Sequence, residues 1–85
     1  MKEFQNIRLS QQEVELLRAL GENDVIVAQE VMRLRDNTIS LSPIQAESLR
    51  SRLTEILAEA GFDDRYRLTP VGEMIESLID RFFIE

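Results

Sequence analysis

A chain of 85 residues that contains neither cysteine nor histidine excludes several kinds of protein at once. Its length fits a single domain over residues 1–85, and the missing cysteines exclude a disulfide framework and a thiolate metal site. The net charge of −6 opposes direct binding of nucleic acid, which normally requires a basic surface.

The first predicted helix runs from Gln11 to about Leu20, after a short extended piece near residues 7–9. Ser10 followed by Glu13 is the pattern of a capping box, in which each side chain bonds the backbone N–H of the other residue. Gly21 stands where such a helix commonly ends.

A second, shorter helix is predicted after Asn23 or Asp24, either of which can cap it. Val27, Val31 and Leu34 have helical spacing. The β-branched run over residues 25–27 is also compatible with the start of a strand. The helix is preferred because Ala-Gln-Glu follows the run directly.

The third predicted helix, Pro43 to Ala60, has the clearest pattern in the chain. An extended piece near residues 39–41 precedes it, Ser42 can cap it, and proline suits its first position. Gly61 then ends it. Its inward stripe is predicted to comprise Leu49, Leu53, Ile56, Leu57 and Ala60.

The fourth predicted helix runs from Pro70 to about Phe83, with Thr69 as its cap. Gly72 lowers the stability of its first turn, so we expect another backbone to approach there, such as that of a further extended piece near residues 66–68. The end of the chain can complete the core or contact a second copy, which leaves the oligomeric state open. The residues predicted to face inward are Val71, Ile75, Leu78 and Phe82, although Phe82, Phe83 and Ile84 can equally contact a second copy.

Together these elements predict a mainly all-α fold, a compact four-helix bundle with short connections. The extended pieces near 7–9, 39–41 and 66–68 each have one apolar side and can pair into a minimal sheet.

The absence of histidine and cysteine removes the commonest general base, the commonest metal ligand and the best nucleophile. We therefore expect no enzyme, no cofactor and no metal site. Adjacent Asp63 and Asp64 could bind a hard cation, but the spacing of a calcium-binding loop is missing, and a solvated turn explains them better.

Negative charge is concentrated in the last third of the chain. Residues 1–54 carry eight acids and seven bases, whereas residues 55–85 carry eight acids and three bases, a balance of −5. Glu73, Glu76 and Asp80 share one face of the fourth predicted helix. A solvated face is the ordinary explanation, and docking of a basic partner is the functional one. The candidate contacts are Asp63, Asp64, Glu73, Glu76 and Asp80, with Tyr66 as an aromatic anchor.

Two resemblances follow from the C-terminal residues. The stretch 57–62 followed by 66–73 resembles the end of a winged-helix domain, where a helix, a wing and a leucine-threonine-proline helix start succeed one another. This resemblance implies a regulator or adaptor that acts through protein contacts.

A second C-terminal pattern consists of Gly61, Phe62, Asp63, Tyr66, Leu68, Thr69 and Gly72. With this pattern the whole chain resembles small acidic bacterial proteins, similar to immunity proteins paired with contact-dependent growth inhibition toxins, including nucleases of the EndoU class. The resemblance implies an immunity protein that covers the basic active-site surface of a nuclease toxin, expected to be a ribonuclease.

The expected location is the cytoplasm, with no contact to a membrane. Residues 1–6 carry an acid and amides where a secretory signal peptide requires an apolar run. The longest apolar run, Val25–Ala28, is far too short to span a bilayer.

Overall fold

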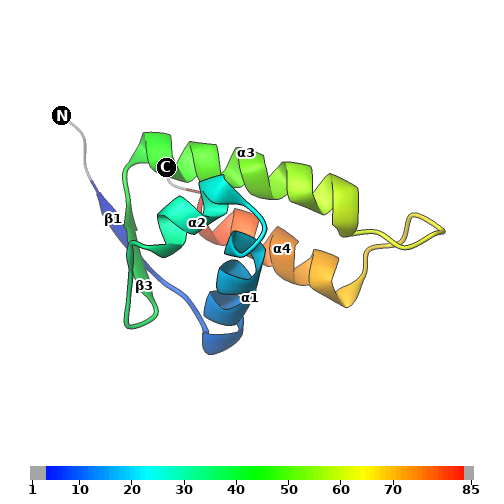
Figure 1. Cartoon of the computed structure of the whole chain (residues 1–85), viewed down its shortest axis with the longest axis horizontal. Helices are drawn as coiled ribbons and strands as arrows, with labels where there is room; N and C mark the ends of the chain where they lie inside the picture. Colours follow the sequence, from blue (N-terminus) through cyan, green and yellow to red (C-terminus); the bar gives the residue numbers. More distant parts are fainter. Residues whose placement is uncertain (1–3, 84–85) are drawn as a thin grey trace.

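Helices account for most of the chain in a computed structural model that describes residues 4–83 (Figure 1). Residues 1–3 and 84–85 lie outside the described part, and with them the start of the stretch 1–6 and Ile84, a residue expected either in the core or at a contact. In chain order the elements are β1 (Gln5–Arg8), α1 (Gln11–Gly21), α2 (Val25–Val31), β2 (Leu34–Arg35), β3 (Thr38–Leu41), α3 (Pro43–Ala60) and α4 (Pro70–Arg81).

The starts of three helices follow the predicted capping chemistry. Glu13 N–H donates to Ser10 Oγ at 3.1 Å, and Ser10 N–H donates to Glu13 Oε1 at 2.8 Å, which completes the capping box of α1. Ser42 caps α3 in the same reciprocal way, with Gln45 as its partner. Thr69 Oγ1 accepts from the N–H of Gly72 at 3.0 Å and begins α4. These bonds satisfy N–H groups that have no partner within their own helix.

A three-stranded antiparallel sheet with the order β1-β3-β2 lies at one end of the molecule (Figure 1). Ile7 pairs with Ile39 in β3, and Ile39 pairs in turn with Leu34 in β2. Asp36 and Asn37 join β2 to β3 with φ angles of 50° and 68°. Positive φ at both central residues is the hallmark of a type I′ hairpin turn.

This sheet only partly confirms the predicted all-α bundle. The extended pieces near 7–9 and 39–41 pair with each other as expected. The piece at 66–68 does not join them, and Leu68 instead forms an isolated bridge with Phe62. Its place in the sheet is taken by Leu34, which was predicted to continue the second helix. That helix ends at Val31 because the tight turn at Asp36 and Asn37 folds the chain back immediately afterwards.

The core lies where the sheet, α1 and the paired helices α3 and α4 meet. Its buried hydrophobic residues are Leu9, Val14, Leu17, Val27, Ile39, Leu41, Ala46, Leu49, Leu53, Ile75, Leu78 and Phe82. Burial of Phe82 places that residue in the core rather than at a contact. Phe83 is 65% exposed and lies 4.7 Å from the Arg50 guanidinium carbon, a cation–π contact.

Two predicted core positions are wrong, and the inner face of α4 explains one of them. Val71 is 49% exposed because Gly72, its neighbour, turns toward α3 in the first turn of α4. Ala60, predicted to end the inward stripe of α3, is exposed at the last turn of that helix. The buried line on α4 thus starts at Gly72 and continues through Ile75.

Gly72 is required because the backbone at the end of α3 passes directly over it. A Cβ atom on Gly72 would overlap the carbonyl oxygen of Gly61 and come within 2.8 Å of Leu68 Cδ1. The predicted close approach is therefore confirmed, with Gly61 as the main neighbour. The contact fixes how α4 leaves the loop that follows α3.

Candidate protein-binding surface

The loop Gly61–Thr69 between α3 and α4 folds into a tight hairpin, the 61–69 hairpin below. Phe62 bridges to Leu68, and Asp63 N–H donates to the carbonyl oxygen of Arg67 at 2.9 Å. Tyr66 N–H closes the turn by donating to Asp63 O at 2.9 Å. In Figure 1 this hairpin projects at the end of the molecule opposite the sheet.

Asp63 holds the tip of the hairpin together. One oxygen of its carboxylate accepts from the backbone N–H groups of Arg65 and Arg67, at 2.8 and 2.9 Å. The other oxygen pairs with Arg67 Nε at 3.3 Å. The N–H groups of Arg67 and Arg65, followed by the Arg67 side chain, hold the pKa of Asp63 below its ordinary value. Asp63 therefore has a set of partners inside the hairpin, and Asp64 is the acid of the tip that these bonds do not use.

The base of the hairpin is fixed to both helices. Thr69 donates twice to the carbonyl oxygen of Gly61, from its N–H at 2.9 Å and from its hydroxyl at 3.1 Å. The same hydroxyl accepts from Gly72 N–H, so one threonine joins the hairpin to the first turn of α4. These bonds consequently fix the base of the hairpin, and with it the tip, to the ends of α3 and α4.

Tyr66 has a backbone conformation that is unfavourable for a bulky residue. It is also the most exposed large hydrophobic residue at this end of the molecule. Its φ angle is 60°, in the left-handed region where glycine and asparagine are at ease and a bulky residue is rare. Its side chain is 89% exposed. Phe62 and Val71, beside the base, are 44% and 49% exposed. An exposed tyrosine on a hydrogen-bonded hairpin has the properties of an interface anchor, because tyrosine has only two side-chain torsions to order on binding.

A row of carboxylates lines the outer face of α4. Glu73, Glu76 and Asp80 are all exposed, and their spacing of three and four residues aligns them over about 10 Å of helix. Among the ion pairs formed within residues 4–83, none involves these three side chains. Arg81, the base nearest in sequence, pairs instead with Glu13 of α1 at 3.3 Å. The row therefore presents uncompensated negative charge to solvent.

The six residues predicted from the sequence form two groups with different character. The hairpin tip contains two acids followed by two arginines and carries no net charge, so its main exposed feature is Tyr66. The negative charge lies on α4, in the row of Glu73, Glu76 and Asp80. Figure 1 shows the hairpin next to the first turn of α4 and the rest of the helix leading away from it. Glu73 lies in that first turn, so it is the member of the row nearest to the hairpin along the helix.

A second exposed surface, on α2, was not predicted from the sequence. Val25 and Met32 are 73% and 82% exposed, and Ile26 is 45% exposed. The pattern that could have indicated it is the seven-residue separation of Val25 and Met32, which puts them on one stripe opposite buried Val27.

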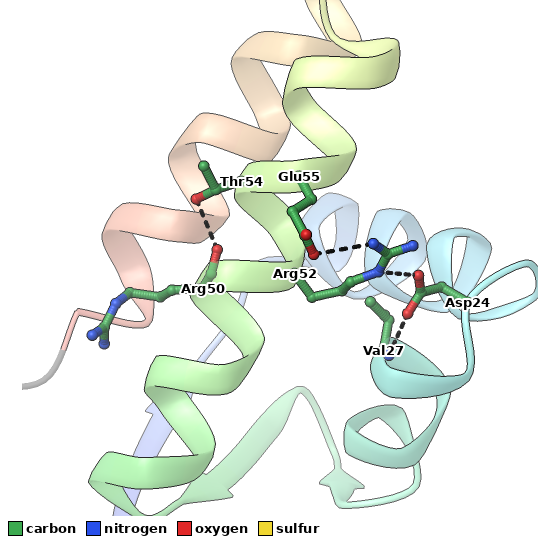
Figure 2. Close-up of polar contacts among 6 residues, drawn as sticks. All are labelled: Asp24, Val27, Arg50, Arg52, Thr54 and Glu55. Atoms are coloured by element: carbon green, nitrogen blue, oxygen red, sulfur yellow. Dashed lines mark hydrogen bonds and ion pairs between the residues drawn. The ribbon is translucent and has the colours of Figure 1, made fainter.

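An ion pair between helices sets the position of α2, as Figure 2 shows. Asp24 caps α2 by accepting from Val27 N–H at 3.0 Å, and its other oxygen pairs with Arg52 of α3. Arg52 also binds Glu55, three residues along the same helix, at 3.1 Å. Burial of Asp24 opposes its charge, yet the N–H of Val27 and the Arg52 guanidinium outweigh burial and lower the pKa of Asp24.

Comparisons of the chain with protein-family models, with curated proteins and with solved structures found no match. In the part of the chain that the structure describes, no helix has the length and apolar character needed to cross a membrane. Over the same residues, no three acidic side chains gather in a group that could hold a metal ion.

Proposed function

We propose that this chain is a cytoplasmic immunity protein, which binds a basic nuclease toxin and covers the surface of its active site. The observation that carries this proposal is the row of carboxylates on α4, which form no ion pair within residues 4–83, beside the exposed side chain of Tyr66 on its hydrogen-bonded hairpin. The role is one of binding and not of catalysis, and it involves no cofactor.

Electrostatics favours a basic partner. A nuclease cleft is positively charged because it binds a phosphate backbone, and it attracts an anionic surface over distances comparable to the Debye length. Glu73, Glu76 and Asp80 supply such a surface, and the net charge of −6 adds a field of the same sign. This complementarity accelerates association and selects the partner more than it adds affinity.

We assign the affinity for the partner mainly to contacts of the 61–69 hairpin. Tyr66 can insert into a pocket of the partner, where a buried aromatic anchor commonly contributes 2 kcal/mol or more, a rough value for an interface hot spot. Phe62 and Val71 can exclude water around it. The hydrogen bonds of Asp63 and Thr69 hold the hairpin in one conformation before binding, which lowers the entropic cost of association.

The test is protection from toxicity. The C-terminal domain encoded by the gene immediately upstream is expressed with and without this chain, and growth and complex formation are followed. We expect the upstream domain alone to stop growth, and co-expression to restore growth with a stable one-to-one complex. Absence of toxicity, or toxicity without rescue, would contradict the proposal.

A matched pair of variants locates the surface. Glu73→Lys with Glu76→Lys should slow association about tenfold or more at low salt, because steering toward a basic cleft is lost. Glu15→Lys with Glu47→Lys changes the net charge by the same amount at exposed sites on α1 and α3. This control should slow association much less than the double variant on α4. Equal effects of the two double variants would show that only the net charge matters.

A winged-helix-like regulator or adaptor is the second candidate, and the connectivity of residues 5–41 favours it. Helices α1 and α2 are joined by only three residues, the β2–β3 hairpin follows, and β3 pairs back with β1 in the order β1-β3-β2. Strand, helix pair and hairpin in this arrangement resemble a winged helix-turn-helix. The hairpin that corresponds to a wing is then β2–β3 and not the segment after α3, on which the sequence resemblance rested.

The outer face of α2 supports contacts with protein in this second candidate. In a DNA-binding helix-turn-helix protein, the second helix enters the major groove and basic side chains contact the phosphates. Here that face carries Val25, Ile26 and Met32. A mobility-shift assay with duplex DNA at low salt distinguishes the two modes. We expect no shift, and a shift that salt abolishes would indicate nucleic-acid binding.

A further inference from the structure

A groove between α1 and α2 is lined by residues that the proposed toxin contact does not use. Its floor is made of Gly21, Ala28 and Val31, and its volume is about 340 Å³. Gly21 keeps the two helices close, since a Cβ atom there would lie 3.3 Å from the Ala28 Cα atom. The floor is therefore apolar, shallow and formed by two helices packed together.

Exposed apolar side chains border this groove along α2. Val25 and Met32 lie three residues before and four residues after Ala28, on the same side of the helix. They are 73% and 82% exposed, so each leaves most of its apolar area in water. Two such side chains beside an apolar groove are typical of a surface that another protein covers. Methionine is well suited to this role because its flexible side chain adapts to an opposing surface.

The remaining wall of the groove carries one charge of each sign. Arg18 and Glu22 both line it, one turn apart on α1 and immediately after it. Neither belongs to an ion pair within residues 4–83. The other charged groups around α2 are compensated, because Glu30 pairs with Arg33 at 2.9 Å and Asp24 pairs with Arg52. This face is thus electrically balanced, in contrast to the row on α4.

We propose that two copies of the chain associate through this face about a two-fold axis. In such an interface each surface meets its own copy, so Arg18 of one copy can face Glu22 of the other, twice. Met32 of each copy enters the groove over Gly21 and Ala28 of its partner. The apolar contact supplies the affinity, and the two reciprocal ion pairs fix the register.

A second copy is the occupant that fits because the charge pattern complements itself. Two molecules of net charge −6 repel each other, and most strongly where the carboxylates of α4 would meet. The groove between α1 and α2 offers a balanced and apolar face where that repulsion is weaker than at the carboxylates of α4. A stable dimer covers about 800 Å² of each partner. The chain exposes 5946 Å², so the contact requires a modest share of its surface.

Sedimentation equilibrium over micromolar to millimolar concentrations tests the association. We expect the wild-type chain to dimerise and Met32→Glu to weaken dimerisation about tenfold or more, because a carboxylate would have to enter the apolar groove. Met32 is largely exposed, so the variant should fold normally, which its melting temperature checks. Ile44→Glu is the matched control, since Ile44 is 62% exposed at the start of α3 and should leave dimerisation unchanged.

A charge-swap experiment tests the two-fold geometry. Arg18→Glu places two acids on the face and Glu22→Arg places two bases there, so each variant alone should lose its dimer. Mixing the two variants should restore a heterodimer, and the double variant Arg18→Glu with Glu22→Arg should dimerise as the wild type does. A wild-type chain that stays monomeric at millimolar concentration would overturn the proposal. A dimer that survives both Met32→Glu and Arg18→Glu would also overturn it.

Discussion

The two tight hairpins of the molecule meet the same backbone requirement with very different residues. The β2–β3 turn has positive φ angles at Asp36 and Asn37, and the 61–69 hairpin has one at Tyr66. Aspartate and asparagine tolerate that conformation because their short side chains bond the local backbone. Tyrosine has no such compensation. The first turn therefore follows local preference, and the second departs from it.

The two hairpins also differ in how their hydrophobic side chains are buried. β3 lies between two strands and buries Ile39 and Leu41 completely. The 61–69 hairpin leaves Phe62 and Tyr66 exposed and is held by hydrogen bonds of Asp63 and Thr69. A strained, exposed aromatic residue on a well-braced hairpin does not serve stability, so the difference directs attention to binding at this end of the molecule.

The largest expected effect concerns the base of the 61–69 hairpin. Gly72→Ala should lower the free energy of unfolding by about 2–3 kcal/mol, because the new methyl group overlaps the backbone of Gly61. On helix propensity alone the change would be favourable by up to about 1 kcal/mol. Urea denaturation measures the difference, and a gain in stability would contradict the close backbone contact.

Gly21→Ala is the control for this substitution in the other half of the molecule. Its Cβ atom would lie 3.3–3.4 Å from Ala28 and Val31, a contact that a small adjustment relieves. The expected change is within about 1 kcal/mol. An effect as large as that of Gly72→Ala would mean that the two glycines do not differ in the way the packing indicates.

A smaller effect is expected where α2 is joined to α3. Asp24→Ala should cost about 1–2 kcal/mol, since α2 loses its N-cap and Arg52 loses a partner. Asp24→Asn keeps a capping oxygen and should cost less. The difference between the two variants, measured by denaturation, separates the cap from the ion pair.

The same pair predicts a dependence on pH. The pKa of Asp24 is lower in the folded chain than in the unfolded one, so its ionised form stabilises the fold above about pH 4. This contribution is lost as the pH falls through the folded pKa. The stability advantage of the wild type over Asp24→Asn should therefore shrink on acidification, and an advantage that grows would contradict the assignment.

The smallest effect compares the two turns directly. Tyr66→Gly should raise the free energy of unfolding by about 0.5 kcal/mol, because relief of the left-handed strain exceeds the added entropy of the unfolded chain. Asn37→Gly should change it by a few tenths at most, since asparagine already tolerates its φ of 68°. Thermal melts of the two variants beside the wild type measure both.

Local chemistry made much of the helical structure predictable. The bounds of α3 coincide with Pro43–Ala60 because its cap, its first-position proline and its final glycine all act within a few residues. Strand β2 was not predicted because Leu34 continues the helical spacing of Val27 and Val31. In addition, the turn between β2 and β3 contains no glycine that would indicate a hairpin. The exposure of Val71 depends on the contact between Gly72 and Gly61, which is a tertiary feature.

The sequence was sufficient to name the residues of the candidate site but not to predict how they are arranged in space. Helical periodicity alone puts Glu73, Glu76 and Asp80 on one face. The partners of Asp63 and the backbone conformation of Tyr66 arise from the hairpin, whose pairing no periodicity encodes. The apolar stripe of α2 escaped notice because a helix of seven residues is too short to show which of its faces is buried.

The most direct test of the proposed function is the affinity of Tyr66→Gly for the proposed toxin partner, measured beside the stability of the variant. The account predicts binding weakened by about 30-fold or more, the equivalent of a hot-spot residue, in a protein at least as stable as the wild type. Loss of affinity together with gain of stability would assign the strained tyrosine to binding. Unchanged affinity would contradict that assignment and remove the 61–69 hairpin from the interface.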